Sequence, residues 1–227
     1  MATGVLVIAQ SGAGKSTSIE GLNPEETFII NVANKPLPFK GWKAKYPKRT
    51  KENPDGRMQS VATPAGILDA MKYISEGRPE IKVLVVDDWQ YMSSFEFFNR
   101  ASEKGYDKFT DIGAGITAVA KKVKDLRDDL IVYFLTHEEE GVDSRGNKKY
   151  KAKTIGKMVD EKLTLEGLFS IVLFGKLKKD DDGKVHYVFE TQTDGETTCK
   201  SPRGMFADFE IPNDLGKVTQ AILEYDK

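Results

Sequence analysis

The chain has 227 residues, a length that fits one generous domain and is too short for two full domains with a linker. Charged residues make up 30% of the sequence and hydrophobic residues 39%, a balance that is typical of a globular protein and excludes an intrinsically disordered one. The 34 Lys and Arg side chains and 35 Asp and Glu side chains leave a net charge of -1, so any affinity for a polyanion has to come from local clusters.

The sequence predicts neither a membrane protein nor a secreted one. Its longest apolar runs, such as residues 5–8 and 83–86, are far shorter than the roughly 20 residues of a membrane span. The first residues carry no basic segment and no cleavage site of a signal peptide. The one cysteine, Cys199, has no partner for a disulfide and fits a reducing compartment. We therefore expect a single cytoplasmic domain over residues 1–227.

Short apolar runs alternate with helix-like patterns along the chain. Several runs are almost wholly apolar, as expected for parallel strands that are covered on both faces. The alternation predicts an α/β fold with a mostly parallel central sheet flanked by helices. The predicted strands are residues 4–8, 27–32, 82–86, 130–135, 170–174 and 184–189.

Helices are predicted between these strands and at the end of the chain. Residues 64–76 begin with a proline, which suits the first turn of a helix. A spacing of three and four residues gives a second helix one apolar face, formed by Ile112, Ile116, Val119, Val123 and Leu126. A last helix covers residues 214–225. Before it, the turn Asp-Asp-Asp-Gly at 180–183 and the alternating apolar residues that follow predict a β-hairpin.

The strongest functional signal directly follows the first predicted strand. It reads Ala9-Gln10-Ser11-Gly12-Ala13-Gly14-Lys15-Ser16-Thr17, with Ala9 in place of the usual first glycine. Small residues let backbone N–H groups surround a phosphate at the start of a helix, which we expect here. In such a P-loop, Lys15 binds the β- and γ-phosphates of ATP and the Ser16 hydroxyl ligates Mg²⁺. The predicted nucleotide-binding residues are Gln10, Ser11, Gly12, Ala13, Gly14, Lys15, Ser16 and Thr17.

A second motif ends the predicted strand 82–86. Two carboxylates, Asp87 and Asp88, follow it at the carboxyl edge of the sheet, where ligands bind in open α/β folds. Asp87 is expected to hold Mg²⁺ as a Walker B aspartate does. Asp88 has two interpretations, which the sequence leaves open. It polarises the water that attacks the γ-phosphate, or it caps a helix that begins near Trp89.

The predicted strand 130–135 is followed by Thr136 and His137. P-loop ATPases of the RecA and AAA types carry a polar sensor at this place, which contacts the γ-phosphate or the attacking water. His137 has the hydrogen-bond donor that such a sensor needs. The alternative is a loop histidine without a functional partner.

Two segments interrupt the regular alternation. Residues 33–63 form a basic, irregular insertion, in which Phe39, Trp42 and Tyr46 are interleaved with many cations. Cations that follow a phosphate backbone and aromatic rings that stack on bases favour single-stranded DNA as a partner. The predicted contacts are Lys40, Trp42, Lys43, Lys45, Lys48 and Arg49. The alternative is a solvated loop whose aromatic rings pack onto the domain. Residues 138–157 are expected to be a mobile charged loop.

Taken in order, these motifs resemble phage-encoded RecA-like ATPases of the single-strand annealing and recombination group. The resembling pieces are AQSGAGKST, VLVVDDWQYM, FLTHEEE, TIGKM and ETTCKSPRGMF. The resemblance implies a RecA-like P-loop NTPase fold with a C-terminal β-hairpin, ATP and Mg²⁺ as cofactors, and a ring or filament of identical subunits on single-stranded DNA. It also implies the cytoplasm of a host cell, and roles for Lys200 and Arg203 at the γ-phosphate of a neighbouring subunit.

One departure from that family concerns the catalytic base. RecA-type enzymes usually carry a glutamate just after the second strand, whereas residues 30–35 read Ile-Asn-Val-Ala-Asn-Lys. Either Asp88 takes over this role or hydrolysis is slow. The sequence thus favours a Mg²⁺-dependent ATPase that acts on single-stranded DNA in phage recombination or annealing. Its predicted catalytic residues are Lys15, Asp88, His137, Lys200 and Arg203. A small-molecule kinase and a slowly hydrolysing, ATP-dependent switch protein are the alternatives.

Overall fold

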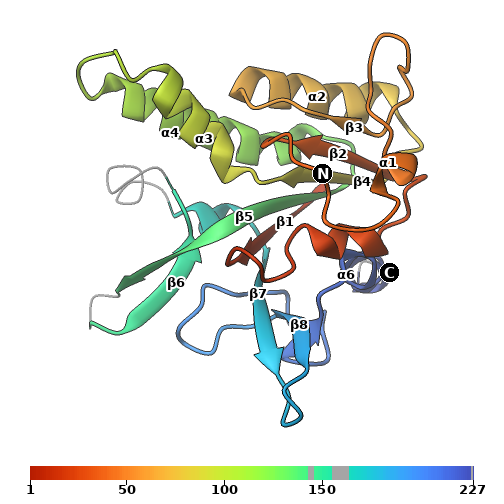
Figure 1. Cartoon of the computed structure of the whole chain (residues 1–227), viewed down its shortest axis with the longest axis vertical. Coiled ribbons are helices and arrows are strands. Elements are labelled where there is room, and N and C mark those ends of the chain that lie inside the picture. Colours follow the sequence, from red (N-terminus) through yellow and green to blue (C-terminus); the bar gives the residue numbers. More distant parts are fainter. Residues whose placement is uncertain (143–145, 155–163, 226) are drawn as a thin grey trace.

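A computed structural model describes residues 1–142, 146–154, 164–225 and 227. It confirms the expected α/β architecture, in which a mostly parallel sheet lies between layers of helices (Figure 1). The strands are β1 (Thr3–Ala9), β2 (Thr27–Asn31), β3 (Met58–Gln59), β4 (Val83–Asp87), β5 (Ile131–Val142), β6 (Lys148–Ala152), β7 (Ile171–Lys179), β8 (Val185–Glu190) and β9 (Glu210–Pro212). The helices are α1 (Trp42–Lys45), α2 (Pro64–Gly77), α3 (Gln90–Asn99), α4 (Asp107–Lys122) and α6 (Leu215–Tyr225), with short 3₁₀ helices η1 (Thr17–Gly21), η2 (Val123–Asp125) and η3 (Leu165–Leu168).

The strand order determines which side chains meet at the edge of the sheet. The order is β3-β2-β4-β5-β1-β7-β8-β9, and β6 pairs with the far end of β5. In this order the neighbouring strands between β3 and β7 pair in parallel, while β8 and β9 are antiparallel additions. The ladder places Ala9 opposite His137 and Asn31 opposite Asp87. The carboxyl ends of β1, β2 and β4 therefore meet along one edge, where His137 lies within the longer strand β5.

The apolar strands are buried on both faces, and alternate residues serve two cores. In β1, Leu6 and Ile8 belong to the core beneath α2 and α4, whereas Val5 and Val7 belong to the core beneath α6 and η1. Figure 1 shows the same division, with α2, α3 and α4 on one side of the sheet and α6 on the other. This double coverage explains why the predicted strands read as continuous apolar runs and not as an alternation.

The helix expected after the P-loop is reduced to η1, a 3₁₀ helix of 5 residues. The sequence explains the short length, because Gly21 is its last residue and Pro24 follows closely, and neither residue favours continuation of a helix. Close packing also limits this segment, since a Cβ on Gly21 would lie 2.0 Å from Oδ1 of Asp214. The P-loop is thus followed by a compact turn that packs against the start of α6.

The segment 138–157, expected to be a mobile loop, forms a β-hairpin over much of its length. β5 continues to Val142 and pairs with the antiparallel strand β6, so that Glu139 lies opposite Lys151 and Glu140 opposite Tyr150. Cross-strand pairs of opposite charge stabilise such a ladder, and Lys148 forms an ion pair with Glu140 at 3.3 Å. Residues 143–145 and 155–157, and with them most of the piece TIGKM, lie outside the described residues.

The insertion 33–63 is largely irregular, as expected, but it contributes to the fold at two points. β3 adds a short parallel strand to the edge of the sheet beside β2. Phe39 and Tyr46 are buried in the core beneath α6 and η1, and the partly buried Trp42 packs against the same core. Phe39 and Tyr46 therefore cannot stack on bases, because packing onto the domain already covers them.

The C-terminal hairpin is confirmed. β7 and β8 pair antiparallel, with Lys179 opposite Val185, and the turn between them contains Gly183 at φ 77°. Its left-handed backbone is one that glycine adopts readily.

Within the described part of the chain, no helix combines the length and the apolar character that crossing a membrane requires.

Phe134 provides a test of the core beneath α2 and α4. Its ring is fully buried, with ring centroids 4.7 Å from Trp89 and 5.3 Å from Phe169. Phe134→Ala should lower the free energy of unfolding by about 3–5 kcal/mol, because it leaves a cavity between these rings. The measurement is urea denaturation followed by circular dichroism.

The matched control is Phe98→Ala in α3, because the Phe98 side chain is 70% exposed. This variant should change the free energy of unfolding by less than about 0.5 kcal/mol. Equal losses in the two variants would contradict the assignment of Phe134 to the core.

Candidate nucleotide-binding site

The loop after β1 has the backbone of a phosphate-binding turn. Gly12 and Gly14 have φ angles of 85° and 81°, which an L side chain adopts only with strain. The loop is closed by a hydrogen bond from the Ala13 N–H to the Gln10 carbonyl at 3.1 Å. Gly175 of β7 allows this close packing, because a Cβ there would lie 2.8 Å from that of Ala9. The loop is thus shaped by two glycines of its own and by one glycine on β7.

The predicted pair of metal ligands is brought together. The Ser16 hydroxyl donates a hydrogen bond to Oδ1 of Asp87 at 2.8 Å, although the two residues are far apart in sequence. Asp87 is the last residue of β4, and Ser16 follows the P-loop lysine. A hydroxyl and a carboxylate in contact offer two hard oxygen ligands, which suit Mg²⁺ together with phosphate oxygens.

Lys15 and Asp88 form a buried ion pair at the centre of the site. The Lys15 Nζ lies 2.7 Å from Oδ1 of Asp88, and their side chains are only 7% and 2% exposed. Asp88 has a φ angle of 57°, so its backbone is left-handed as the chain leaves β4. Its carboxylate therefore faces the P-loop instead of capping α3, whose N-cap residue is Trp89. The geometry therefore excludes the second interpretation of Asp88, a cap on α3, and the first stays a prediction.

His137 completes this group from β5. Its Nε2 lies 3.6 Å from Oδ1 of Asp88, and its ring meets that of Tyr91 edge to face. The His137 backbone N–H donates a hydrogen bond to Oε1 of Gln90, in α3, at 3.3 Å. The predicted sensor residue thus lies beside the carboxylate that is predicted to position the attacking water.

The carboxyl groups of the two neighbouring aspartates have pKa values that are shifted in opposite directions. Burial raises the pKa of the Asp87 carboxyl above its usual range, although Lys15 and the Ser16 hydroxyl act against this effect. Burial acts in the same direction on Asp88. There, however, His137, Lys15 and Lys35 outweigh it and hold the pKa well below its usual range. Asp88 is therefore a firmly ionised carboxylate.

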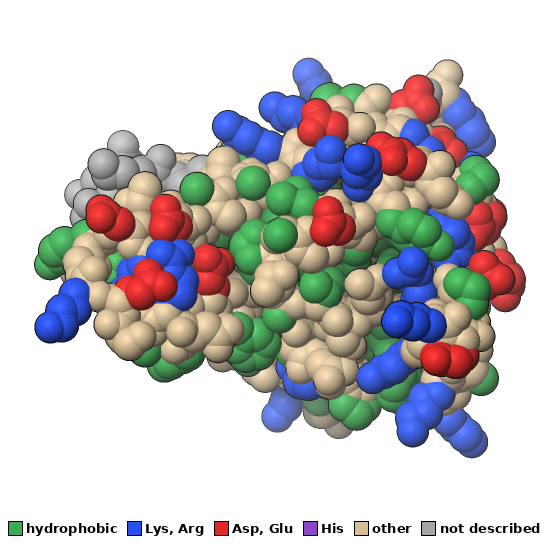
Figure 2. Space-filling model, turned by 90° about the horizontal axis from the view of Figure 1, so that it is seen from above, with side chains coloured by type: hydrophobic (Ala, Val, Ile, Leu, Met, Phe, Trp, Pro, Cys, Tyr) green, Lys and Arg blue, Asp and Glu red, His purple; other side chains and the backbone are tan. Residues whose placement is uncertain are grey.

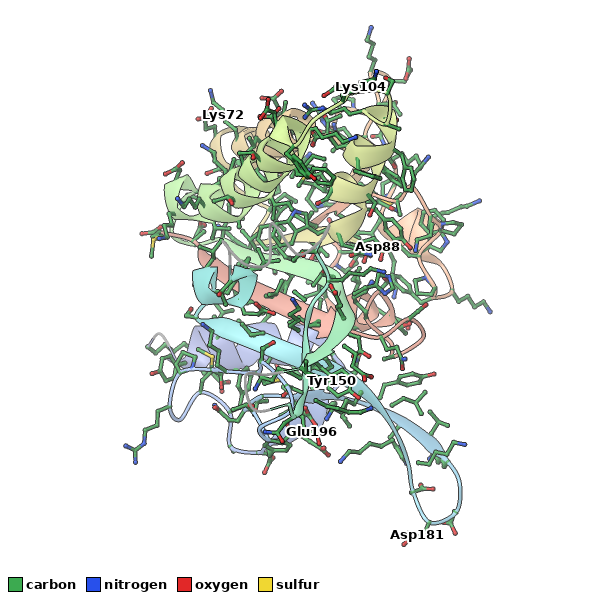
Figure 3. The ribbon with its side chains drawn as sticks, turned by 90° about the vertical axis from the view of Figure 1, so that its left-hand side faces the viewer. Lys72, Asp88, Lys104, Tyr150, Asp181 and Glu196 are labelled. Carbon is green, nitrogen blue, oxygen red and sulfur yellow. The ribbon has the colours of Figure 1, made fainter. Side chains whose placement is uncertain are left out.

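A cavity of about 310 Å³ lies in front of the P-loop. Its lining includes every predicted nucleotide-binding residue except Ala13, together with Asp88 and His137. A larger hollow of about 1090 Å³ adjoins the other side of the loop and reaches the β5–β6 hairpin near Tyr150 and Glu196. Figure 3 shows Asp88 between the helical layer and the two hairpins that carry Tyr150 and Asp181.

Three further residues at the loop were not identified from the sequence as site residues. Lys35 and Tyr187 line the smaller cavity, and the Asn213 side chain donates to the Ala13 carbonyl at 3.3 Å. The Tyr187 ring comes from β8 and would be 3.0 Å from a Cβ on Gly14. The sequence did carry a signal for Lys35, because it comes three residues after the end of the predicted strand 27–32, at the ligand-binding edge. No comparable signal marked Tyr187 or Asn213.

Other predicted residues lie elsewhere in this subunit. The backbone of Lys200 pairs with Val172 near the amino end of β7, and the Arg203 side chain is exposed. Neither residue belongs to the described lining of the two cavities beside the P-loop. The structure therefore does not bring them to the P-loop of their own chain.

The ion pair of Asp88 and Lys15 predicts a loss of stability when it is broken. Asp88→Asn should lower the free energy of unfolding of the nucleotide-free protein by about 3 kcal/mol, because Lys15 remains buried without its counter-charge. The folded-state pKa of Asp88 is depressed, so its stabilising effect is present above the unfolded-state pKa of about 3.9. The difference between wild type and variant should therefore shrink as the pH falls below about 4. Urea denaturation at a series of pH values measures it.

Asp129→Asn is the control for this experiment. Asp129 also pairs with two cations, Lys82 and Arg127, but its side chain is 43% exposed. Its replacement should change the free energy of unfolding by less than about 1 kcal/mol, because water screens such a pair. A loss for Asp88→Asn as small as that for Asp129→Asn would show that the buried pair does not stabilise the fold.

Comparison with known proteins agrees with this geometry. Residues 1–203 match the protein family described as AAA domain. No curated protein matches the sequence. One similar solved structure is titled "The Structure Of A DnaB-Like Replicative Helicase And Its Interactions With Primase". Its sequence is 13% identical to this one, and the TM-score is 0.46. The match covers 82% of this chain and 51% of that chain, so this chain spans about half of the helicase chain's length. Because the family match includes the P-loop, both aspartates and His137, the chain belongs to the AAA domain family of P-loop NTPases.

Proposed function

We propose that the protein is a Mg²⁺-dependent ATPase that acts on single-stranded DNA. The observation that carries the nucleotide part is the pairing of the P-loop with the end of β4, through Ser16 with Asp87 and Lys15 with Asp88. The first pair is a hydrogen bond and the second is an ion pair. They place a hydroxyl, a carboxylate and a lysine where a triphosphate and its metal ion require them. The family match supports the same assignment.

Each residue of the site has its own role in phosphoryl transfer. Lys15 binds the β- and γ-phosphates, and Ser16 and Asp87 offer oxygen ligands to Mg²⁺, which supplies charge neutralisation between the phosphates when bound. Asp88 accepts a hydrogen bond from the attacking water and orients it. His137, beside Asp88, donates a hydrogen bond to the water or to the γ-phosphate.

The electrostatics of Asp88 favour one of the alternatives as a second candidate, the slowly hydrolysing switch. A carboxylate whose pKa lies well below its usual range is a weak proton acceptor at neutral pH. Residues 30–35 supply no other carboxylate at the end of β2. In this candidate function, ATP binding changes the conformation and recruits a partner, while turnover stays slow.

The proposed DNA contacts come from the basic insertion, residues 33–63. Lys40 and Lys43 are exposed, and Trp42 is half-buried. Figure 2 shows Lys and Arg side chains gathered at the end of the molecule where Figure 1 places α1. Lys45, Lys48 and Arg49 are partly engaged within the domain, Arg49 above the Tyr73 ring at 4.1 Å. We therefore assign the main electrostatic contact to Lys40 and Lys43.

The oligomer and the biological setting are also part of the proposal. In a ring or filament, Lys200 and Arg203 would act at the γ-phosphate in a neighbouring subunit. The exposure of Arg203 and its absence from the described lining of its own site support a role in trans. Phage recombination or annealing is the process that we propose for such an assembly.

The first test is the rate of ATP hydrolysis with Mg²⁺, measured by phosphate release with and without single-stranded DNA at low salt. Wild-type protein should hydrolyse ATP faster when DNA is present. Lys15→Ala should abolish nucleotide binding and turnover, because the phosphates lose their buried cation. Unchanged turnover in Lys15→Ala would refute the site, and tight binding with negligible turnover in wild type would favour the switch.

The second test addresses the DNA contacts. The double variant Lys40→Gln with Lys43→Gln should weaken binding to single-stranded DNA, measured by fluorescence anisotropy at several salt concentrations. The slope of log K against log salt should become shallower by about 0.7 for each phosphate contact that is lost.

The control is Lys72→Gln with Lys104→Gln, which removes the same charge from the helical layer, where Figure 3 places both residues. This variant should leave the slope unchanged. Equal slopes in the two double variants would move the DNA contact away from the basic insertion.

A further inference from the structure

A second lysine reaches the central carboxylate of the site. The Lys35 Nζ lies 2.5 Å from Oδ2 of Asp88, while Lys15 occupies the other carboxylate oxygen. The two lysines differ in exposure, because the Lys35 side chain is 57% exposed and the Lys15 side chain is only 7% exposed. Asp88 thus pairs with two cations, the buried ammonium group of Lys15 and the ammonium group of Lys35, whose exposed side chain lines the cavity.

The backbone that carries Lys35 is held in place by the end of β2. The Asn31 side chain donates to the Lys35 carbonyl at 2.6 Å and accepts from the Lys35 N–H at 3.2 Å. Between them, Asn34 adopts a left-handed φ of 52°, which asparagine tolerates better than most residues. The Lys35 side chain passes over the Tyr91 ring, and its Nζ lies 5.4 Å from the ring centroid. A fixed backbone with a long, exposed side chain suits a cation that moves a short distance between partners.

The charges of the site show why such a move is favoured. Asp87 and Asp88 face Lys15 and Lys35, so two carboxylates and two ammonium groups share one edge of the sheet. A triphosphate that enters the cavity adds negative charge beside Asp88, and Lys15 turns to its phosphates. Lys35 lines the same cavity as Ser16 and Thr17, and its ammonium group is the second cation within reach of the incoming phosphate.

We propose that Lys35 is a second phosphate-binding lysine, which contacts the γ-phosphate within the same subunit and makes the site prefer ATP to ADP. In the nucleotide-free protein Asp88 holds its ammonium group near the place where the terminal phosphate arrives. This inference rests on the proposed function, namely that the P-loop cavity binds ATP. It adds a γ-phosphate contact at the position after β2, where the usual carboxylate is missing.

Lys35→Met tests this role by nucleotide binding alone. We would titrate wild type and variant with ADP and with a non-hydrolysable ATP analogue, both with Mg²⁺, using isothermal titration calorimetry. Loss of a charged hydrogen bond to the γ-phosphate should weaken binding of the ATP analogue about ten- to hundredfold. Binding of ADP should change by less than about twofold. Lys35→Arg should retain most of the preference for the ATP analogue, because it keeps the charge.

The matched control is Lys82→Met. Lys82 also forms an exposed ion pair with an aspartate, Asp129, at 2.5 Å, but it lies just before the amino end of β4, at the opposite edge of the sheet from Asp87. This variant should bind both nucleotides as wild type does. Circular dichroism and urea denaturation of each variant confirm that it is folded.

The outcomes separate the two proposals. Equal weakening of ADP and the ATP analogue by Lys35→Met, or no effect on either, would overturn the role of Lys35 while the ATP-binding site stands. A wild-type protein that binds neither nucleotide would overturn the proposed function itself, together with the inference that rests on it. Selective loss of the ATP analogue, with rescue by Lys35→Arg, would support both.

Discussion

The parallel registration of β1, β5 and β4 holds the site together. Because β5 is inserted between the other two strands, Ala9 at the start of the P-loop lies directly opposite His137. The same sheet ends β4 at Asp87, so that Asp88 turns back toward Lys15. Parallel strands carry their functional residues to one edge, and the two cores on either side of the sheet leave these strands little freedom to slip.

Within this frame, one buried carboxylate, that of Asp88, pairs with two lysines of the site. A left-handed Asp88 is unfavourable for a residue with a Cβ, and burial of its charge is unfavourable as well. Both are compensated by Lys15, Lys35 and the nearby His137. The proposed nucleotide would compete with Asp88 for the two lysines, because its phosphate oxygens would enter the cavity that both lysines line.

The far end of the chain also shapes the P-loop. Asn213, just before α6, donates to the Ala13 carbonyl, and Tyr187 of β8 covers Gly14. α6 packs against η1, the short turn that replaces a longer helix after the loop. The antiparallel strands β8 and β9 thus do more than extend the sheet, because they bring residues from the last part of the sequence to the loop near its beginning.

The sequence by itself determined the α/β class, the P-loop and the two carboxylates at the end of β4, because these depend on local patterns of apolar runs, small residues and charges. The pattern of strand ends also predicted that His137 lies near the P-loop, and His137 does lie opposite Ala9 and beside Asp88, although β5 continues past it to Val142. Only the tertiary structure decided that Lys35 reaches Asp88, that Tyr187 and Asn213 touch the P-loop, and that Phe39 and Tyr46 are buried. It also showed that the charged segment after β5 pairs into a hairpin. These features depend on contacts between residues distant in sequence, and no local pattern specifies which partner a side chain meets.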